Sequence, residues 1–272
     1  MVLVDQLEEW AYGAKGVQVI SDRDREQARY DAWSRQMLDD LDHALEESSV
    51  PGHLREPYDW FHAQLEALIT RETVVLEIGA GSGQHTLPLA ELTDLLVTLD
   101  ISVPALTVGA LRGGSSVRPV CADMEALPIG DGSVDIVVSA GSLSYGEPDL
   151  VDAEIRRVLR PGGALVVVDS LNHNPFYRLN RWLHYRKGQT SLSTLKRMPD
   201  QRRIARLMQG FGHVRLRRYG SFVFLYPPLR RFLGDLRAQN ACVVLDREMG
   251  RGRNAFKFVL VGTDYMRRPS GG

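Results

Sequence analysis

The chain has few cysteines, no long apolar run and almost no net charge. Cys121 and Cys242 are its only cysteines, which excludes a disulfide framework or a thiolate metal site and favours a reducing cytoplasm. No run of about 18 apolar residues occurs, and the stretch after Met1 is not typical of a signal peptide. We therefore expect a cytoplasmic protein without a transmembrane segment. The net charge of −1 gives no basic field for nucleic acid, so we expect no nucleic-acid partner.

The near-neutral total conceals two regions of opposite charge. Residues 1–66 contain fifteen acidic and six basic residues, whereas residues 176–218 contain twelve basic residues and Asp200 as the single acidic one. These regions could pair within one chain or between two copies, so a homodimer and an intramolecular contact both remain open. The content of 44% hydrophobic residues is typical of a folded chain with a sizeable core.

The remaining features are organised around a buried strand that leads into a glycine-rich turn. Residues 73–78 are mostly β-branched or apolar, as expected of a central strand in a parallel sheet. Gly79, Gly81 and Gly83 follow at alternate positions and allow the backbone to approach a ligand closely. A helix is predicted over residues 84–92, and its first amides would point at that ligand. The stretch predicts a site for a nucleotide-like small molecule.

Strands and helices alternate along most of the chain, which favours a doubly wound α/β sheet. Further strands are predicted at 94–99, 117–122, 134–140, 164–168, 214–219 and 254–261. Helices are predicted at 22–47, 58–69, 149–160, 175–187 and 199–209. The first two helices precede the sheet and are expected to cap it. Two longer connections, after the fifth and sixth strands, are predicted to carry substrate specificity or assembly contacts.

The spacing of the glycines separates two kinds of nucleotide site. The dinucleotide fingerprint has glycine at its first, third and sixth positions. Here Gly79 and Gly81 fit, but the sixth position is Gln84 and the third glycine is Gly83. This spacing, together with Glu77, resembles motif I of the class I S-adenosylmethionine-dependent methyltransferases. An NAD-dependent oxidoreductase is the disfavoured alternative.

Three further stretches are similar to that family, and they occur in the family's order. They are residues 96–101 (LVTLDI), 122–137 (ADMEALPIGDGSVDIV) and 158–165 (VLRPGGAL). The resemblance covers about residues 70–220. It implies S-adenosyl-L-methionine as cofactor and a Rossmann-like sheet of seven mostly parallel strands, with an N-terminal helical cap and insertions after strands five and six. The predicted division is a cap at 1–70, a cofactor-binding core at 71–169, a substrate-facing helical insertion at 170–210, and the last two strands at 211–272, with a helical insertion at about 222–252.

The resemblance assigns cofactor contacts residue by residue. Those implied for the methionine end are Glu77, Gly79, Ala80, Gly81 and Gly83; for ribose and adenine, Asp100 and Ile101; for adenine, Asp123 and Met124; and for the methionine and its methyl group, Ser139, Ala140 and Gly141. A carboxylate such as Asp100 suits the two neighbouring hydroxyls of a ribose. Asp100 and Asp123 could instead be a helix cap and a turn residue.

The catalytic candidates follow the fourth and fifth strands, where the ligand crevice of an open α/β sheet lies. Tyr145 follows strand four and His173 follows strand five. His173 is the preferred general base because imidazole titrates near neutral pH, with His184 and Tyr145 as substitutes. His173 could instead cap the next helix. No metal is expected, since no acid occurs at 139–141 to match Asp169.

The helix predicted at 175–187 has a polar stripe that would suit an anionic or sugar-like acceptor. The predicted substrate-binding residues are Tyr145, Asn172, Tyr177, Arg178, Arg181 and His184. A solvated basic face is the alternative. The segment 222–233 mixes aromatic residues with arginines and could rest on a membrane, although a helical lid or a dimer contact is preferred.

Together these features predict methyl transfer to a polar small molecule. The favoured reaction is O-methylation of a sugar, a glycan precursor or another biosynthetic intermediate, in which the protein supplies proximity and alignment. The alternative is an inactive binding or scaffold subunit that keeps the methyltransferase fold, because a fold alone does not certify a reaction.

Overall fold

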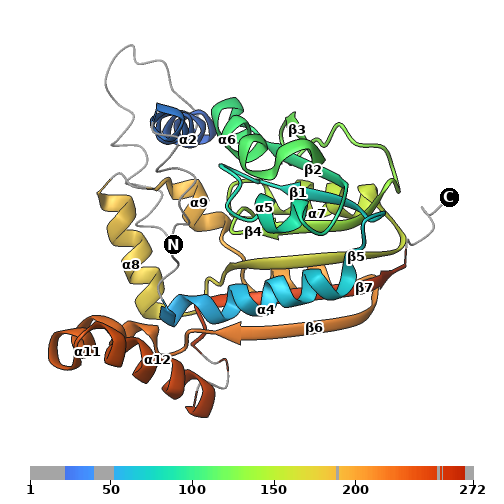
Figure 1. Cartoon of the computed structure of the whole chain (residues 1–272). Coiled ribbons are helices and arrows are strands. Elements are labelled where there is room, and N and C mark those ends of the chain that lie inside the picture. The colour runs from blue at the N-terminus through green and yellow to red at the C-terminus, as the bar shows by residue number, and fades with distance from the viewer. Residues whose placement is uncertain (1–21, 40–51, 188–189, 250–251, 253, 267–272) are drawn as a thin grey trace, which may run out of the picture.

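A computed structural model describes residues 22–39, 52–187, 190–249, 252 and 254–266 (Figure 1). Its centre is a seven-stranded sheet with the order β3-β2-β1-β4-β5-β7-β6. The strands are β1 Val74–Ile78, β2 Leu95–Asp100, β3 Val117–Cys121, β4 Val134–Ala140, β5 Leu159–Ser170, β6 Phe211–Tyr219 and β7 Lys257–Tyr265. The first five strands run parallel, whereas β7 pairs antiparallel with β5 and β6. This confirms the predicted doubly wound, mostly parallel sheet of seven strands.

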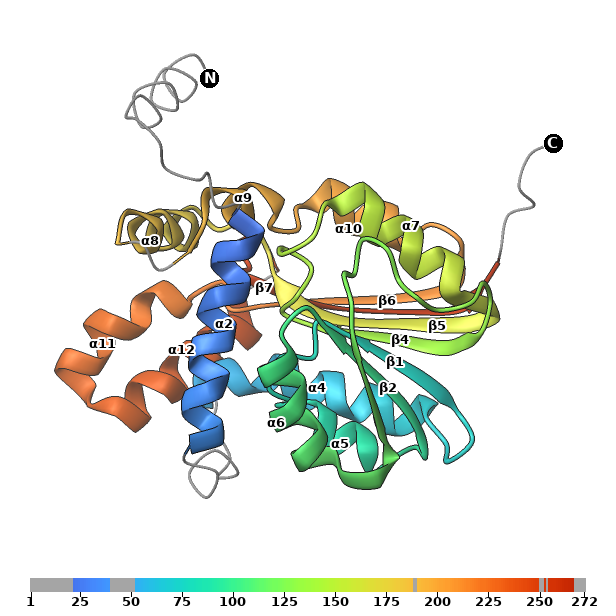
Figure 2. The same cartoon turned by 90° about the horizontal axis from the view of Figure 1, so that it is seen from above.

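Helices cover both faces of the sheet (Figure 2). One face carries α4 Gly52–Leu68, α5 Thr86–Ala90 and α6 Val103–Gly113, and the other carries α7 Pro148–Val158 and α10 Gln201–Met208. The other helices are α2 Asp22–Asp39, α8 Pro175–Arg186, α9 Leu192–Arg197, α11 Tyr226–Leu233 and α12 Asp235–Met249, with short 3₁₀ turns η1 Gly114–Ser116 and η2 Val223–Leu225.

The core consists of two apolar clusters, one on each face of the sheet. In β4, Ile136 and Val138 belong to the cluster that contains Phe61 of α4, whereas Val137 between them belongs to the cluster that contains Ile155 of α7. Successive side chains of a strand point to opposite faces, so a strand buried on both sides must be apolar at nearly every position. This is why the central strands were recognisable in the sequence.

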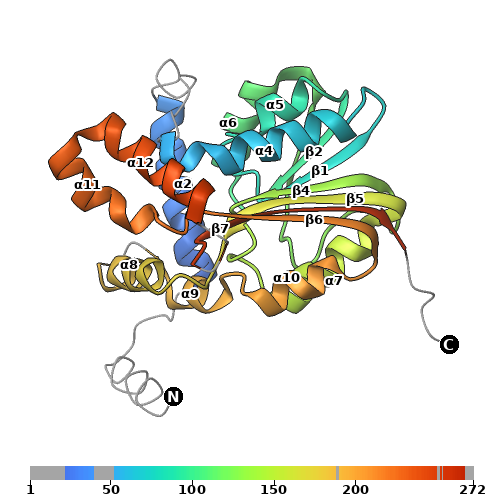
Figure 3. The same cartoon turned by 90° about the horizontal axis from the view of Figure 1, so that it is seen from below.

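Both predicted insertions are present; α8, α9, α11 and α12 lie at one end of the sheet, whereas α10 lies along its face beside α7 (Figure 3). The chain from β5 to β6 forms α8, α9 and α10, and the chain from β6 to β7 forms η2, α11 and α12. None of the described helices combines the length and the apolar character that crossing a membrane requires. The division into domains at residues 70, 169 and 210 stays a prediction.

Several predicted boundaries were wrong by a few residues. The helix after the glycine loop begins at Thr86 instead of Gln84. The helix predicted to end at Arg160 ends at Val158, because β5 already begins at Leu159 and pairs with β4 across a register shift. Helix α4 begins at Gly52, before the predicted start. The prediction of a helix over 22–47 holds as far as Asp39, and its remainder lies outside the described residues.

Candidate functional site

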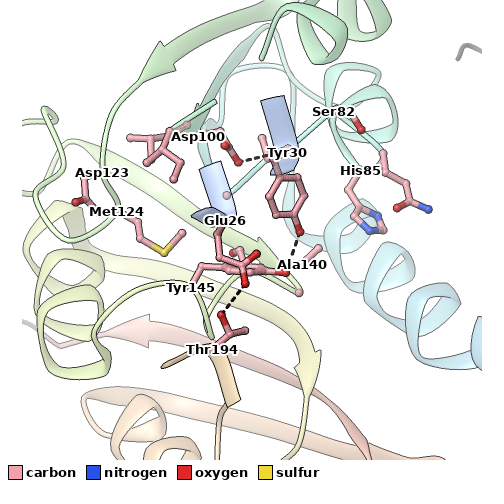
Figure 4. A pocket seen from close by; sticks show the side chains of 18 of the residues that line it. Glu26, Tyr30, Ser82, His85, Asp100, Asp123, Met124, Ala140, Tyr145 and Thr194 are labelled. Carbon is pink, nitrogen blue, oxygen red and sulfur yellow. Dashed lines mark hydrogen bonds between the residues drawn. The ribbon is translucent and has the colours of Figure 1, made fainter. Parts of the chain in front are cut away.

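A cavity of about 260 Å³ opens at the carboxyl ends of β1, β2 and β4 (Figure 4). This is where ligands bind in open α/β sheets. Its walls come from the predicted cofactor loops, from α2 and from α9. The lining residues are Glu26, Tyr30, Trp33, Tyr58, Gly79, Ala80, Gly81, Ser82, Gln84, His85, Leu99, Asp100, Ile101, Ala122, Asp123, Met124, Ala140, Gly141, Ser142, Tyr145, Ser193, Thr194 and Arg197.

The loop after β1 is shaped by glycines at positions where a side chain would not fit. Gly79 has φ +65°, and a Cβ there would lie 2.2 Å from the Cβ of Ser142. A Cβ on Gly83 would lie 2.5 Å from the Cα of Gly109 in α6. Gly79 therefore lets the chain pass tightly beneath the cavity, whereas Gly83 serves helix packing and does not line the cavity.

Glu77, in the strand before this loop, is hydrogen-bonded to the helix that follows the loop. Its side chain is buried, and its Oε2 accepts a hydrogen bond of 2.6 Å from the hydroxyl of Thr86. Burial raises the pKa of Glu77 to about 7, while the hydrogen bond from Thr86 acts in the opposite direction. Glu77 does not line the cavity, so the structure gives it a direct bond to the start of α5 and leaves a cofactor contact as a prediction.

The two predicted adenosine carboxylates both border the cavity. Asp100 accepts hydrogen bonds from the amides of Gly81 and Ser102, each at 2.9 Å. Burial raises the pKa of Asp100, and these backbone donors partly offset that effect. Asp123 and Met124 form another wall, away from His85 in Figure 4. A carboxylate, a thioether and a glycine cradle around one cavity fit a ligand that has a ribose, a flat ring and a flexible tail.

The loop after β4 lines the cavity next to the glycine turn. Ala140 and Gly141 line the cavity, whereas Ser139 is buried behind them. The hydroxyls of Ser139 and Ser142 lie 2.7 Å apart, and that of Ser142 donates to the carbonyl of Ile78 at 2.8 Å. These bonds join the loops after β1 and β4 into one rigid floor. The role of Ser139 as a direct ligand stays a prediction.

Helix α2 contributes a wall that sequence reasoning did not assign to the site. Glu26, Tyr30 and Trp33 line the cavity, and Gln27 anchors the helix by donating to the carbonyl of Ile101 at 2.9 Å. Oε1 of Glu26 accepts hydrogen bonds from the Ser191 amide and the Thr194 hydroxyl next to α9. Side chains of α2 and α9, which are far from the core loops in sequence, therefore enclose one space with those loops.

Two tyrosines meet at this wall. The hydroxyl oxygens of Tyr30 and Tyr145 lie 2.9 Å apart, and their rings form an edge-to-face pair with centroids 5.7 Å apart (Figure 4). Burial is the main cause that raises the pKa of Tyr30, with a further contribution from Tyr145. Tyr30 therefore remains a neutral phenol and can donate its proton to the oxygen of Tyr145. Tyr145 is the predicted catalytic candidate that borders the cavity.

His85 forms a further wall together with Tyr58. The two rings stack with centroids 5.3 Å apart, and Nδ1 of His85 lies 3.3 Å from Nε2 of His62. Burial lowers the pKa of His85 to about 3, so its imidazole is neutral at physiological pH. Lys257 donates to the hydroxyl of Tyr58 at 3.0 Å. His85 therefore borders the cavity as a neutral ring.

The structure does not bring the other catalytic candidates to the cavity. His173 is exposed, with a ring nitrogen 3.4 Å from the side-chain amide of Gln201, and neither His173 nor His184 lines the cavity. The alternative role of His173 as a helix cap was wrong, because Oδ1 of Asn174 accepts from the first amides of α8. As a cap, asparagine offers a short side-chain oxygen that reaches these amides.

The predicted substrate-binding stripe also lies outside the cavity lining. The hydroxyl of Tyr177 is 3.0 Å from that of Ser170, and Arg181 donates to the hydroxyl of Thr190 at 3.4 Å. Asn172 donates its backbone amide to Pro199, and Arg178 is exposed. Their substrate roles stay predictions. The insertion does bring the basic side chain of Arg197 in α9 to the cavity, and the sequence analysis did not assign that residue to the site.

The described residues contain no group of three or more histidine, cysteine, aspartate or glutamate side chains that could hold a metal ion. Asp169 is buried at the end of β5, where its two oxygens accept from the amides of Ser170 and Leu143. Burial raises the pKa of Asp169, and Lys257 opposes that shift. These bonds give Asp169 a structural role in fixing the loop after β4.

Comparison with known proteins favours an S-adenosylmethionine site over a dinucleotide site. A family described as a methyltransferase domain matches residues 76–167. The chain is 31% identical to a demethylmenaquinone methyltransferase from Mycolicibacterium gilvum, over 56% of this chain and 74% of that protein. It is 38% identical to a protein of the same name from Renibacterium salmoninarum, over 35% of this chain and only 40% of that protein.

Solved structures show the same fold. Geranyl diphosphate C-methyltransferase from Streptomyces coelicolor A3(2), solved with S-adenosyl-L-homocysteine, superimposes with a TM-score of 0.59 at 14% identity, covering 92% of this chain and all of that one. The chain therefore belongs to the class I S-adenosylmethionine-dependent methyltransferases, and its cofactor is S-adenosyl-L-methionine. The glycine cradle, Asp100 and Met124 around the cavity fit this cofactor.

The residues that sequence reasoning missed come from outside the core motifs. Tyr30 and Trp33 belong to the helix that was predicted within residues 22–47 and was expected to cap the sheet. Thr194 and Arg197 lie on α9, a helix that was not predicted. A signal for α9 exists, since Ser191 begins a short helix by accepting from the amide of Thr194, but only the fold places it over the cavity.

Proposed function

We propose that this chain transfers a methyl group from S-adenosyl-L-methionine to a hydroxyl of a polar small molecule that contains a ring, such as a sugar, a glycan precursor or another biosynthetic intermediate. The observation that carries the proposal is the cavity that has Asp100 and Asp123 on its cofactor side and the hydrogen-bonded pair of Tyr30 and Tyr145 on another wall. The sulfonium of the cofactor supplies an activated methyl group, so the protein must mainly align the acceptor.

The aromatic lining supports a ring-shaped acceptor. Tyr30, Trp33, Tyr58 and Tyr145 border the cavity, together with the polar side chains of α9. Aromatic faces pack against the flat or apolar faces of rings, and hydroxyl and guanidinium groups fix the polar edges. Arg197 donates from Nε to Glu147 at 3.1 Å, and the other N–H groups of its guanidinium would attract a partial or full negative charge on the acceptor, which fits the proposed polar or anionic character.

Tyr145 is proposed to position the acceptor hydroxyl. Because Tyr30 stays protonated and can donate to Tyr145, the second lone pair of the Tyr145 oxygen is available to accept a hydrogen bond from the acceptor. That bond would aim the acceptor oxygen along one line. Neither His173 nor His184 lines the cavity, so their assignment as general bases stays a prediction that the His173→Ala variant tests; removing a general base is expected to cost about 100-fold or more in turnover.

The test compares variants in a methyl-transfer assay on a panel of hydroxylated ring compounds, with S-adenosyl-L-homocysteine as the measured product. Tyr145→Phe should lower kcat/KM by about 2- to 13-fold, the effect of one hydrogen bond of about 0.5–1.5 kcal/mol, and leave cofactor affinity unchanged. His173→Ala is the parallel variant. If it keeps full turnover, the histidine is not the base; if Tyr145→Phe keeps full turnover, the tyrosine does not position the acceptor.

A second acceptor class is favoured by the curated relatives. Two of them are named for demethylmenaquinone, and the aromatic walls at Tyr30 and Tyr58 also suit a planar quinone-like ring. The position of the new methyl group in the product, on oxygen or on carbon, separates the two proposals by mass spectrometry and NMR. Cofactor binding without turnover on any acceptor would instead favour a binding or scaffold subunit.

A cytoplasmic location and a homodimer complete the proposal. The location rests on the small number of cysteines, and the dimer on the opposite charges of residues 1–66 and 176–218. Sedimentation equilibrium at low and high salt tests the dimer, because association driven by these charges should weaken as salt screens them.

A further inference from the structure

The two insertions at the cavity end of the sheet expose an unusual number of large apolar side chains. Phe232 near the end of α11 is 81% exposed, and Leu236 near the start of α12 is 76% exposed. Leu233 between them and four side chains of α8 are each at least 44% exposed. The α8 residues are Phe176, Leu179, Trp182 and Leu183. Single exposed apolar residues are ordinary, but a cluster of this size on neighbouring elements marks an interaction surface.

Helix α8 is also in contact with the segment that leads into α11. The ring of Phe176 at the start of α8 stacks on Phe224 of η2, with centroids 4.4 Å apart, and η2 leads directly into α11. Figures 1 and 3 show α8 and the α11–α12 hairpin projecting beyond the same end of the sheet. We call residues 175–187 and 226–237 together the basic apolar surface.

The charge of this surface is almost entirely positive. Residues 175–187 contain four basic residues and no acidic one, and residues 226–237 contain three basic residues and Asp235. The basic residues are Arg178, Arg181, Arg186, Lys187, Arg230, Arg231 and Arg237. Arg230 lies 3.3 Å from Asp235, so the single acid is already paired with a base, and the guanidinium of Arg186 lies over the ring of Trp182.

We propose that the basic apolar surface docks onto the surface of an anionic phospholipid bilayer. Such binding combines apolar side chains that enter the boundary between headgroups and acyl chains with basic side chains that stay among anionic headgroups. Phe232 and Leu236 lie on either side of the short turn between α11 and α12, with Arg231 and Arg237 beside them in sequence. The positive charge selects an anionic bilayer over a second copy of this surface, which would repel it.

Docking would also place the cavity next to the membrane. Helix α8 is followed along the chain by α9, and Thr194 and Arg197 of α9 line the cavity. The docking does not depend on the proposed reaction, and it is tested without cofactor or acceptor.

The experiment measures co-sedimentation of the full chain with phosphatidylcholine vesicles that contain about 30% phosphatidylglycerol, and with pure phosphatidylcholine vesicles, at about 0.1 M salt. The protein should sediment with the anionic vesicles and should not sediment with the neutral ones. The double variant Phe232→Ser/Leu236→Ser should bind at least about tenfold more weakly. The control is Leu111→Ser/Leu150→Ser, which changes two apolar side chains of α6 and α7 that are 54% and 50% exposed, and this variant should bind as the wild type does.

A second variant pair tests the charge. Arg231→Gln/Arg237→Gln should weaken binding to anionic vesicles by about fivefold per arginine, whereas Arg215→Gln on β6 should not. Absence of binding by the wild type, or equal binding by all variants, would overturn the proposal. It would also be overturned if Phe232→Ser/Leu236→Ser instead converted a dimer into a monomer in size-exclusion chromatography with light scattering, since the occupant would then be a second copy.

Discussion

Glu77 offers the sharpest test of how the cofactor loop is built. The side chain is only 2% exposed at the end of β1, and its carboxylate accepts a hydrogen bond from Thr86. Burial raises its pKa from 4.5 to about 7. Replacing Glu77 by Gln keeps an oxygen that can accept from Thr86 and removes the charge, so the variant isolates the effect of ionisation.

Proton linkage gives the direction in which the stability contribution of Glu77 changes with pH. Because the folded-state pKa of Glu77 lies above the unfolded value, the folded state holds its proton more tightly. Its contribution to stability is fully present below pH 4.5 and is lost as the pH rises to about 7. A shift of this size corresponds to about 3 kcal/mol. The Glu77→Gln variant should therefore match the wild type near pH 4.5 and exceed it by up to about 3 kcal/mol above pH 7.

Urea unfolding of both proteins at several pH values between 4.5 and 8 measures this difference. The pKa of His85, which burial lowers to about 3, makes stability rise with pH over part of the same range, but this effect is common to both proteins and cancels in the difference. Glu72→Gln, which changes an exposed carboxylate just before β1, is the control. A difference between Glu77→Gln and wild type that does not change with pH would refute the reasoning.

Two further predictions concern the same loop. Gly79→Ala should destabilise the protein by about 1–3 kcal/mol more than Gly81→Ala, because both residues have positive φ but only the Cβ at position 79 meets Ser142; thermal unfolding without cofactor measures this, and equal losses would contradict it. Asp100→Asn should weaken binding of S-adenosyl-L-homocysteine by about tenfold, the effect of a lost charge-assisted hydrogen bond, as measured by calorimetry; unchanged affinity would remove Asp100 from the ribose site.

The sheet and the cofactor loops were predictable because their signals are local. Strand β4 was predicted with its observed bounds, since a strand buried on both faces is apolar along its whole length. Asp100 and Asp123 were found because each follows a strand whose carboxyl end must meet the others at one edge of the sheet. Strand β5 was less predictable, because Pro161 to Gly163 are typical of a turn, yet the strand already begins at Leu159.

The acceptor side was not predictable to the same degree. Tyr30 and Glu26 reach the cavity because α2 crosses the ends of the strands, and this depends on contacts with residues far along the chain, such as the bond from Gln27 to Ile101. His173 was favoured because it follows β5, but the chain turns away from the cavity before that residue, at Asn172, whose amide bonds to Pro199. A residue that follows a strand must lie near the end of that strand, but its side chain can still point towards the cavity or away from it.

The most direct test of the central claim is calorimetric titration of the purified chain with S-adenosyl-L-homocysteine. The account predicts saturable binding of one ligand per chain, since the described structure places Gly79, Asp100 and Met124 around one cavity. Absence of binding by a chain that circular dichroism shows to be folded would contradict the assignment of this cavity to the cofactor.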